Sequence, residues 1–164
     1  MPDRIKIIAA DLTNVDHQRA IIAMLAAYMR DPMGGNIPMP EATKRDLIPG
    51  LRAHPACHVF LAYSDNTPVG LAICFLGFST FNARPLINIH DIFVDSSVRG
   101  KGIGRLLLEK IETKARDLGC CRLTLEVRED NKVAQTLYRK AGFDRVVVGP
   151  KNIPMEFWRK PLPD

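Results

Sequence analysis

The sequence predicts a single α/β domain over residues 1–164, with four helices and a mixed central sheet of about seven strands. The length suits one sizeable core, and the hydrophobic share of 46% and charged share of 25% are ordinary for a globular protein. Apolar spacing changes between the helical period and the strand period along the chain. A glycine-rich turn also joins a strand-like segment to the strongest amphipathic helix pattern.

Turn residues and changes of period set the bounds of the expected elements. In chain order these are a strand at residues 5–10, helices at 15–30 and 41–53, strands at 58–63, 69–81 and 86–94, a helix at 102–118, a strand at 122–127, a helix at 132–141, and strands at 143–148 and 155–158. The order is therefore β-α-α-β-β-β-α-β-α-β-β, in one domain without repeats or a dividing linker.

Local signals in the first half support these bounds. Asn14 or Thr13 could cap the first helix. Residues 31–40 are rich in proline and glycine and predict a loop. Pro49 and Gly50 are expected to end the second helix early. The three strands that follow are separated by turn sequences, which predicts an antiparallel meander.

The second half contains the strongest helix. Residues 102–118 have an apolar stripe at helical spacing, and Gly119 is a plausible stop. Gly142 closes the shorter helix at residues 132–141 in the same way. The last two segments are predicted to complete the central sheet.

Composition excludes several classes of protein and site. The net charge of +5 is not gathered into a long basic run and no nucleic-acid motif accompanies it, so we expect no nucleic-acid partner. No apolar run could span a bilayer, and residues 1–10 lack the apolar region of a signal peptide, so we expect a cytoplasmic protein that does not bind membranes. The four cysteines form no C-x-x-C pair, which indicates neither a zinc site nor a disulfide framework.

The turn before the long helix has glycines at Gly100, Gly102 and Gly104. Glycine permits close approach of a ligand to the backbone, and the following helix offers unpaired N–H groups. Such a turn is an anion site suited to a pyrophosphate. The cationic side chains that would surround it are Arg99, Lys101 and Arg105.

Other phosphate-binding motifs do not fit this turn. The Walker pattern is absent. In the dinucleotide fingerprint that starts at Gly100, the last glycine position is occupied by Arg105. A kinase loop would be followed by a strand, whereas a helix is expected here.

The segment R-G-K-G-I-G resembles the [QR]-x-x-G-x-[GA] signature of the GNAT superfamily, with matches at Arg99, Gly102 and Gly104. The segment N-K-V-A-Q-T-L-Y-R-K-A-G-F at residues 131–143 resembles the second cofactor motif of that family. Together with their flanks, the two motifs cover most of residues 86–145. The resemblance implies the GNAT fold, an N-acetyltransferase activity, acetyl-CoA as co-substrate, no metal, and a homodimer.

A weaker resemblance extends to the diamine (spermidine/spermine) and thialysine acetyltransferase branch. It rests on H-P-A-C-H-V-F-L-A at residues 54–62, on the helix end A-A-Y-M-R-D and on H-D-I-F-V. That branch has a glutamate at the position before Asp91, whereas this chain has His90. The difference weakens the case for a polyamine substrate.

The resemblance also implies residue roles. Pantetheine would lie along the backbone of a strand that splays from its neighbour, and pyrophosphate would bind amides of residues 100–105. Tyr138 would protonate the departing CoA thiolate. The implied cofactor-binding set is Ile92, Phe93, Val94, Arg99, Gly100, Lys101, Gly102, Ile103, Gly104, Arg105, Asn131, Ala134 and Tyr138.

The acceptor amine requires a base. An alkylamine has a pKa near ~10.4, so removing its proton at neutral pH costs about 4–5 kcal/mol. Asp91 and Glu126 are the candidate catalytic carboxylates, and His90 or a water chain could also take the proton. Either carboxylate could instead form a structural pair.

The acceptor is expected to contact Tyr28, Asp31, His90 and Asp91. The loop at residues 31–39 and the turn at 79–84 complete this region. Because Asp31 is the only acid near that loop, the sequence favours a small primary amine of modest charge, either amino-acid-like or a diamine. A protein N-terminal or lysine acetyltransferase is an alternative. A non-catalytic acyl-CoA sensor is a second alternative, which the presence of Tyr138 disfavours.

Overall fold

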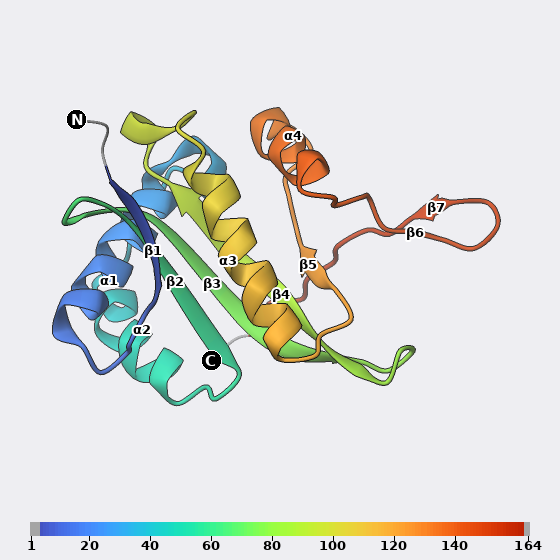
Figure 1. The fold of residues 1–164 in the computed structure, drawn as a ribbon, viewed down its shortest axis with the longest axis horizontal. Helices are drawn as coiled ribbons and strands as arrows, with labels where there is room; N and C mark the ends of the chain where they lie inside the picture. Colours follow the sequence, from blue (N-terminus) through green and yellow to red (C-terminus); the bar gives the residue numbers. More distant parts are fainter. Residues whose placement is uncertain (1–3, 163–164) are drawn as a thin grey trace.

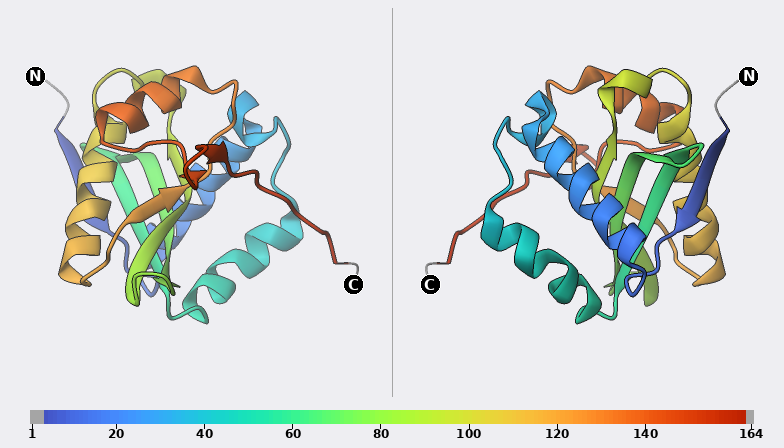
Figure 2. Two further views of the ribbon diagram at one scale, coloured as in Figure 1. Left: turned by 90° about the vertical axis from the view of Figure 1, so that its right-hand side faces the viewer. Right: turned by 90° about the vertical axis from the view of Figure 1, so that its left-hand side faces the viewer.

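The computed structural model describes residues 4–162 as three layers, with a five-stranded sheet between helices. The strand order is β1-β2-β3-β4-β5. Helix α3 crosses one face of the sheet, and α1 and α2 cover the other face (Figures 1 and 2). The elements are β1 (Ile5–Ala9), α1 (Val15–Arg30), the 3₁₀ turn η1 (Pro32–Gly34), α2 (Glu41–Arg52), β2 (Cys57–Ser64), β3 (Thr67–Ser79), β4 (Arg84–Val94), η2 (Ser96–Val98), α3 (Ile103–Asp117), β5 (Leu123–Leu125), α4 (Lys132–Lys140), β6 (Val147–Val148) and β7 (Ile153–Pro154).

The predicted meander is confirmed. β2, β3 and β4 pair in antiparallel order, and β1 adds to the β2 edge. β5 is the one parallel neighbour of β4 in the described sheet, reached by the α3 crossover. No helix in the described part of the chain is long and apolar enough to cross a membrane.

Helix α1 begins where the capping residues predict. The Asn14 side chain accepts hydrogen bonds from the amides of Asp16 and His17, which satisfies two first-turn donors. The helix buries Ile21 and Met24 against the sheet, with 0% and 8% of their surface exposed.

Helix α2 differs from the prediction, since it continues through Pro49 to Arg52 instead of ending early. A proline in a helix lacks the N–H for one backbone hydrogen bond. Here Ile48 and Leu51, on either side of Pro49, are buried against α1 and the sheet. Tertiary burial therefore maintains the helix despite an unfavourable local residue.

The C-terminal part also differs from the prediction. The described sheet has five strands, not seven, because residues 143–148 and 155–158 do not join it. Only β6 and β7 pair with each other, as a two-stranded hairpin. This arm projects away from the sheet (Figure 1), and it exposes 78% of Phe157 and 83% of Trp158. The apolar residues of these two segments favour burial, but their pattern does not specify that they pair with an edge of the central sheet.

Two cores flank the sheet. The core on the α3 side contains Leu107 and Ile111, both fully buried. The core on the α1 side contains Ile21, Leu71 and Phe93. α3 is therefore fixed on the sheet by its apolar stripe, and its N-terminus is held at the end of β4.

We predict that Leu107→Ala lowers the free energy of unfolding by about 2–5 kcal/mol, because it removes a fully buried side chain and leaves a cavity. Leu162→Ala is the matched control, since the same atoms are lost from a side chain that is 83% exposed. Urea unfolding should show a change within about 0.5 kcal/mol for that control. Equal effects of both substitutions would contradict the assignment of the α3 core.

Candidate active site

A β-bulge in β4 determines which way the site residues face. Asp91 pairs with Ile73 and Ile89 pairs with Cys74, so His90 is an extra residue without a partner on β3. Ile89 and Ile92 consequently both contribute to the core on the α3 side. Strict alternation from Ile89 would have placed Asp91 in that core. The bulge instead places Asp91 on the α1 side.

Beyond the bulge, the sheet opens between β4 and β5. Pairing of these strands is limited to Ile87, Asn88 and Ile89. Residues 90–94 have no β5 partner within the described chain, so the two strands splay apart. Ile92 and Val94 face α3 and Phe93 faces α1, in keeping with the alternation of side chains along a strand. The splay exposes β4 backbone where the sequence predicts pantetheine.

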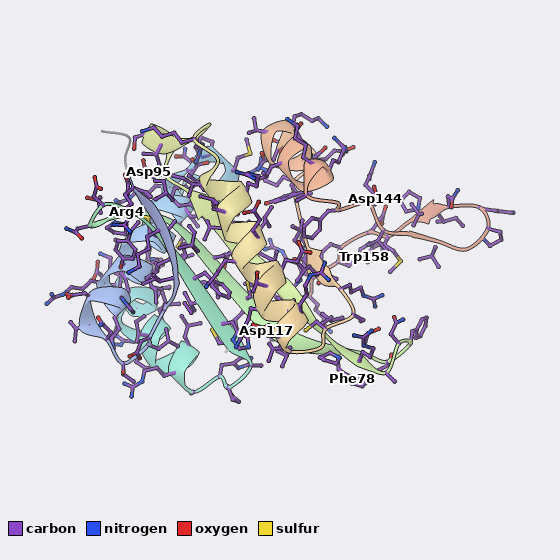
Figure 3. The ribbon with its side chains drawn as sticks, in the orientation of Figure 1. Arg4, Phe78, Asp95, Asp117, Asp144 and Trp158 are labelled. Atoms are coloured by element: carbon purple, nitrogen blue, oxygen red, sulfur yellow. The ribbon has the colours of Figure 1, made fainter. Side chains whose placement is uncertain are left out.

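The glycine turn lies directly after β4, at the end of the sheet opposite Phe78 (Figure 3, where Asp95 marks the start of the turn). Gly100 and Gly102 have φ values of +82° and +81°, which glycine adopts without strain. Gly102 starts α3 and no side chain caps the helix. The first-turn amides of α3 are thus available to an anion, and the turn fits a pyrophosphate.

Gly104 has a different role from the other two glycines. A Cβ there would lie 2.8 Å from Cδ2 of Leu137 on α4. The absence of a side chain therefore lets α4 approach α3 closely. This contact brings the second predicted motif against the first.

The three cations of the turn have different surroundings. Arg99 donates from Nε to the Val94 carbonyl oxygen at 2.9 Å and from Nη2 to Oδ2 of Asp31 at 2.5 Å. Arg105 pairs with Glu109 at 3.1 Å and is mostly exposed. Lys101 is exposed at the turn. Arg99 is therefore directed toward the acceptor loop, residues 31–39, and not only toward the anion cradle formed by the glycine turn and the first amides of α3.

Helix α4 positions Tyr138. Asn131 caps this helix by accepting from the Ala134 amide at 3.1 Å, so both predicted motif residues lie in its first turn. The Tyr138 ring is 8% exposed and contacts Phe143, with ring centroids 5.9 Å apart. Burial, together with the nearby Tyr28, raises the pKa of Tyr138 to about 12. This tyrosine stays protonated at neutral pH.

Tyr28, Asp91 and Tyr138 converge on the splay from α1, β4 and α4. Burial raises the pKa of Tyr28, and the charges of Asp91 and Asp31 raise it further. Burial also raises the pKa of the Asp91 carboxyl, against the opposing charge of His90. None of the three makes a side-chain hydrogen bond within the described chain. Every fully buried polar side-chain atom of the described residues does have a partner, so the polar atoms of these three side chains are not fully buried. Their polar atoms therefore remain accessible to a ligand.

The other two candidates for the base, Glu126 and His90, lie around this cluster. Glu126 follows β5, is exposed, and accepts from Asn88 at 3.5 Å. His90 is exposed and contacts the Phe75 ring edge-on, with centroids 5.5 Å apart. Both lie beside the opening, and neither is as enclosed as Asp91.

Arg128 is a site residue that the sequence did not indicate. It donates from Nη1 to the Pro32 carbonyl oxygen at 3.2 Å and pairs with Asp130 at 2.8 Å. Because Arg128 and Pro32 are 96 positions apart, no local pattern could have linked them.

Other features of the described residues do not compete with this site. A hollow of about 620 Å³ between α1 and α2 is lined by Lys44, Arg45 and Arg52 among others, and by none of the clustered residues. Residues 4–162 contain no group of three or more His, Cys, Asp or Glu side chains arranged to hold a metal ion.

Comparison with known families agrees with this geometry. The sequence model of the Acetyltransferase (GNAT) family matches residues 17–143. The chain belongs to the GNAT acetyltransferase family. The match includes the glycine turn, the splayed strand and α4, so the elements that form the site are the ones the family shares. Acetyltransferases of this family use acetyl-CoA.

Two relatives differ in the acceptor that their names state. An N-alpha-acetyltransferase RimI from Mycobacterium tuberculosis is 39% identical over 138 residues, which cover 82% of this chain and 77% of the relative. A thialysine N-epsilon-acetyltransferase from Bos taurus is 38% identical over 74 residues, which cover 45% of this chain and 43% of the relative.

The fold has counterparts among solved structures. The crystal structure of a probable acetyltransferase superposes with a TM-score of 0.77 at 22% identity, covering 97% of this chain and 99% of that one. At this identity the likeness concerns the fold. It agrees with the three-layer arrangement described above.

The pKa directions predict how stability depends on pH. The folded-state pKa of Asp91 is raised, so the folded protein holds this proton more tightly than the unfolded chain. The contribution of protonated Asp91 to the free energy of unfolding is full below the unfolded pKa of about 4. It is lost as pH rises through the folded pKa. The Tm of Asp91→Asn minus the Tm of wild type should therefore be more positive at about pH 8 than at about pH 4.

Asp31→Asn is the control with the opposite sign. Burial opposes ionisation of Asp31, but hydrogen bonds from Arg99 and the Met33 amide, with the charge of Arg99, lower its pKa. Its contribution is present above the unfolded pKa and lost as pH falls through the folded pKa. Differential scanning calorimetry across this range should show opposite trends, and parallel trends would contradict the assignment.

Proposed function

We propose that this protein transfers the acetyl group of acetyl-CoA to a primary α-amine, with the N-terminus of a polypeptide as the first candidate acceptor. The observation that supports this most directly is the convergence of Tyr28, Asp91 and Tyr138 on the splay beside the anion cradle. These groups come from both faces of the sheet and meet only where β4 and β5 separate.

The residues around the splay have complementary tasks. When bound, acetyl-CoA supplies an activated thioester. The amides at the start of α3 would hold its pyrophosphate, and the unpaired backbone of β4 would align its arm. Asp91, directly or through water, takes the proton that the amine loses as the new C–N bond forms and the C–S bond breaks. No residue of the chain needs to be acylated.

Tyr138 is best described as a hydrogen-bond donor to the departing sulfur. Its pKa is about 12. Complete proton transfer to a thiolate whose ordinary pKa is near 8.5 would be unfavourable, because the tyrosine holds its proton more tightly. A hydrogen bond to the developing negative charge avoids this cost and still stabilises the transition state. The thiolate can then take its proton from water.

The weak base in the site favours an α-amine. A peptide α-amine has a pKa near 7.7–8.0, so freeing its lone pair at pH 7 costs about 1 kcal/mol, against about 4–5 kcal/mol for an alkylamine. Asp91 is a carboxyl whose pKa is raised by burial, and it is the enclosed acid of the cluster. Such a base suits an amine that is already partly neutral.

The cations near the acceptor loop favour a peptide over a free amino acid. A free amino acid carries a carboxylate, which needs a cationic partner in the site. Arg99 and Arg128 are the guanidinium groups that contact this loop, and they are already paired with Asp31 and Asp130. A peptide bond in place of the carboxylate removes that need. The extensive alignment with the RimI relative supports the same choice.

A small alkylamine is the second candidate acceptor. It is supported by the alignment of 74 residues with a thialysine N-epsilon-acetyltransferase. The presence of Asp91 and Glu126 beside the opening is compatible with a cationic acceptor, although few carboxylates are available for a polyamine.

An acceptor panel tests the proposed function. CoA release should be measured with a short peptide that has a free N-terminal α-amine, the same peptide N-acetylated, free alanine, n-butylamine and spermidine. We expect the free peptide to have a kcat/KM at least about tenfold above each other compound. Its amine is neutralised most easily, and, unlike free alanine, it has no carboxylate on the carbon that carries the amine. A higher value for n-butylamine would support the second candidate instead.

Tyr138→Phe is the matched variant for this assay. It removes one hydroxyl and retains the ring that packs against Phe143. The expected result is a fall in kcat of about 10²–10³, with little change in KM, as for other donors to developing negative charge. Binding of acetyl-CoA without turnover of any amine by wild type would contradict catalysis and support an acyl-CoA sensor.

We also propose that two copies of the chain form a homodimer through the C-terminal arm. The arm exposes apolar side chains, with Ile153, Met155, Phe157 and Trp158 each at least 60% exposed. Covering two arms would remove on the order of 1,000 Å² of surface or more, comparable with stable interfaces of about 1,200–2,000 Å².

Light scattering during size exclusion tests this assembly. Wild type should elute at twice the chain mass of 18.3 kDa, and Phe157→Asp with Trp158→Asp should elute as a monomer. Val15→Asp is the control, because it places the same charge on a 56% exposed apolar residue at the start of α1. A monomeric wild type, or a dimeric arm variant, would contradict the proposal.

A further inference from the structure

We propose that Asp31 is a positioning residue that couples the cofactor turn to the acceptor loop through its ion pair with Arg99. This inference rests on the proposed function and assigns a role to residues outside the reacting atoms. The acceptor loop is defined as residues 31–39, between α1 and α2.

Asp31 organises the start of this loop. Its carbonyl oxygen accepts from the amides of Gly34 at 2.9 Å and Asn36 at 3.2 Å. Its Oδ1 accepts from the Met33 amide at 2.9 Å, and its own amide donates to the Tyr28 carbonyl oxygen at 3.0 Å. The fold of residues 31–36 therefore centres on Asp31. The Ile37 amide adds a second link to α1 by donating to the Met29 carbonyl oxygen at 2.9 Å.

The loop is also packed closely on α1. A Cβ at Gly34 would lie 1.8 Å from the Tyr28 carbonyl oxygen, so this position has no room for a side chain. The Tyr28 ring in turn stacks on Phe93 of β4, with centroids 5.5 Å apart and planes 23° apart. A shift of the loop would therefore be transmitted to a ring that lines the splay.

Arg99 connects this assembly to the cofactor turn. Its side chain reaches Asp31 at 2.5 Å, holds the Val94 carbonyl oxygen at 2.9 Å and lies 5.6 Å from the Phe93 ring centroid. Phe93 thus contacts both Arg99 and Tyr28. One guanidinium touches the end of β4, the acceptor loop and the stacked rings at once.

Arg128 holds the same loop from the other side of the splay. It donates to the Pro32 carbonyl oxygen at 3.2 Å from the segment between β5 and α4. The start of the acceptor loop is therefore contacted by two arginines. Arg99 comes from the turn after β4, and Arg128 comes from the segment after β5. Only the Arg99 link leads to the glycine turn.

The electrostatics of the pair explain the direction of coupling. The Asp31 side chain is only 10% exposed, whereas Arg99 is 44% exposed and borders the turn. An anion on the turn would attract Arg99, and Asp31 would repel that anion if Arg99 were not between them. Ordering of the turn by a pyrophosphate therefore fixes Arg99, and Arg99 fixes the loop through Asp31. Acetyl-CoA binding then orders the acceptor loop through this ion pair.

Hydrogen exchange with CoA alone tests this coupling without requiring an acceptor. In wild type, saturating CoA should slow amide exchange in residues 31–39 by about fivefold or more. In Asp31→Asn the CoA-dependent slowing should largely disappear, while calorimetry shows CoA binding no weaker than wild type, because a repulsive negative charge has been removed. Arg99→Lys keeps the positive charge of the turn but cannot bond to the Val94 carbonyl oxygen and to Asp31 at once. This variant should also lose the CoA-dependent slowing of exchange in residues 31–39.

Glu112→Gln is the matched control for carboxylate neutralisation. Glu112 pairs with Arg116 at 2.6 Å on the exposed surface of α3, away from the loop, so CoA-dependent slowing should be retained. The coupling is wrong if Asp31→Asn retains the slowing, or if CoA binds wild type without slowing exchange in the loop. Failure of wild type to bind CoA at all would instead contradict the proposed function.

Discussion

The end of pairing between β4 and β5 at Ile89 is the constraint on which the site depends. Upstream of that point, β5 completes the sheet and both faces are covered by helices. Downstream, β4 keeps its partner β3 but loses its partner β5, so one backbone edge opens inside the molecule. Tyr138 on the α3 side and Tyr28 on the α1 side can influence each other only because the sheet is open there. The same opening leaves backbone groups for an extended ligand.

A close approach of two helices at Gly104 borders this opening. α3 is fixed by a buried stripe that includes Leu107 and Ile111, and it carries Gly104 at its start. Because Gly104 has no side chain, Leu137 of α4 can occupy the adjoining space. α4 therefore lies beside the start of α3, next to the splay. This contact joins the anion cradle at the start of α3 to the helix that carries Tyr138, so the two motifs form one unit of the structure.

Sequence predicted the features that depend on local chemistry. The Asn14 cap, the α3 stripe and the glycine turn were predicted because each is a property of neighbouring residues. Pro49 was misjudged because burial of distant partners outweighed a local preference. The bulge at His90, the pair between Arg99 and Asp31 and the free position of the C-terminal arm depend on residues far apart in the chain. Alternation of apolar residues cannot specify them.

The position of Arg99 shows why a cofactor motif does not determine the acceptor. By pattern alone, this arginine belongs to the pyrophosphate site, and its charge is available there. In the structure its hydrogen bonds go to Val94 and to Asp31, which organises the loop between α1 and α2. Residues of that loop are outside the motif, so relatives can share the turn and differ in what their loops admit. Under the proposed function, the acceptor is selected by how the loop is held against β4 and by how easily the amine loses its proton beside Asp91. Under that proposal, the second property favours a partly neutral α-amine, because such an amine loses its proton at the lower cost.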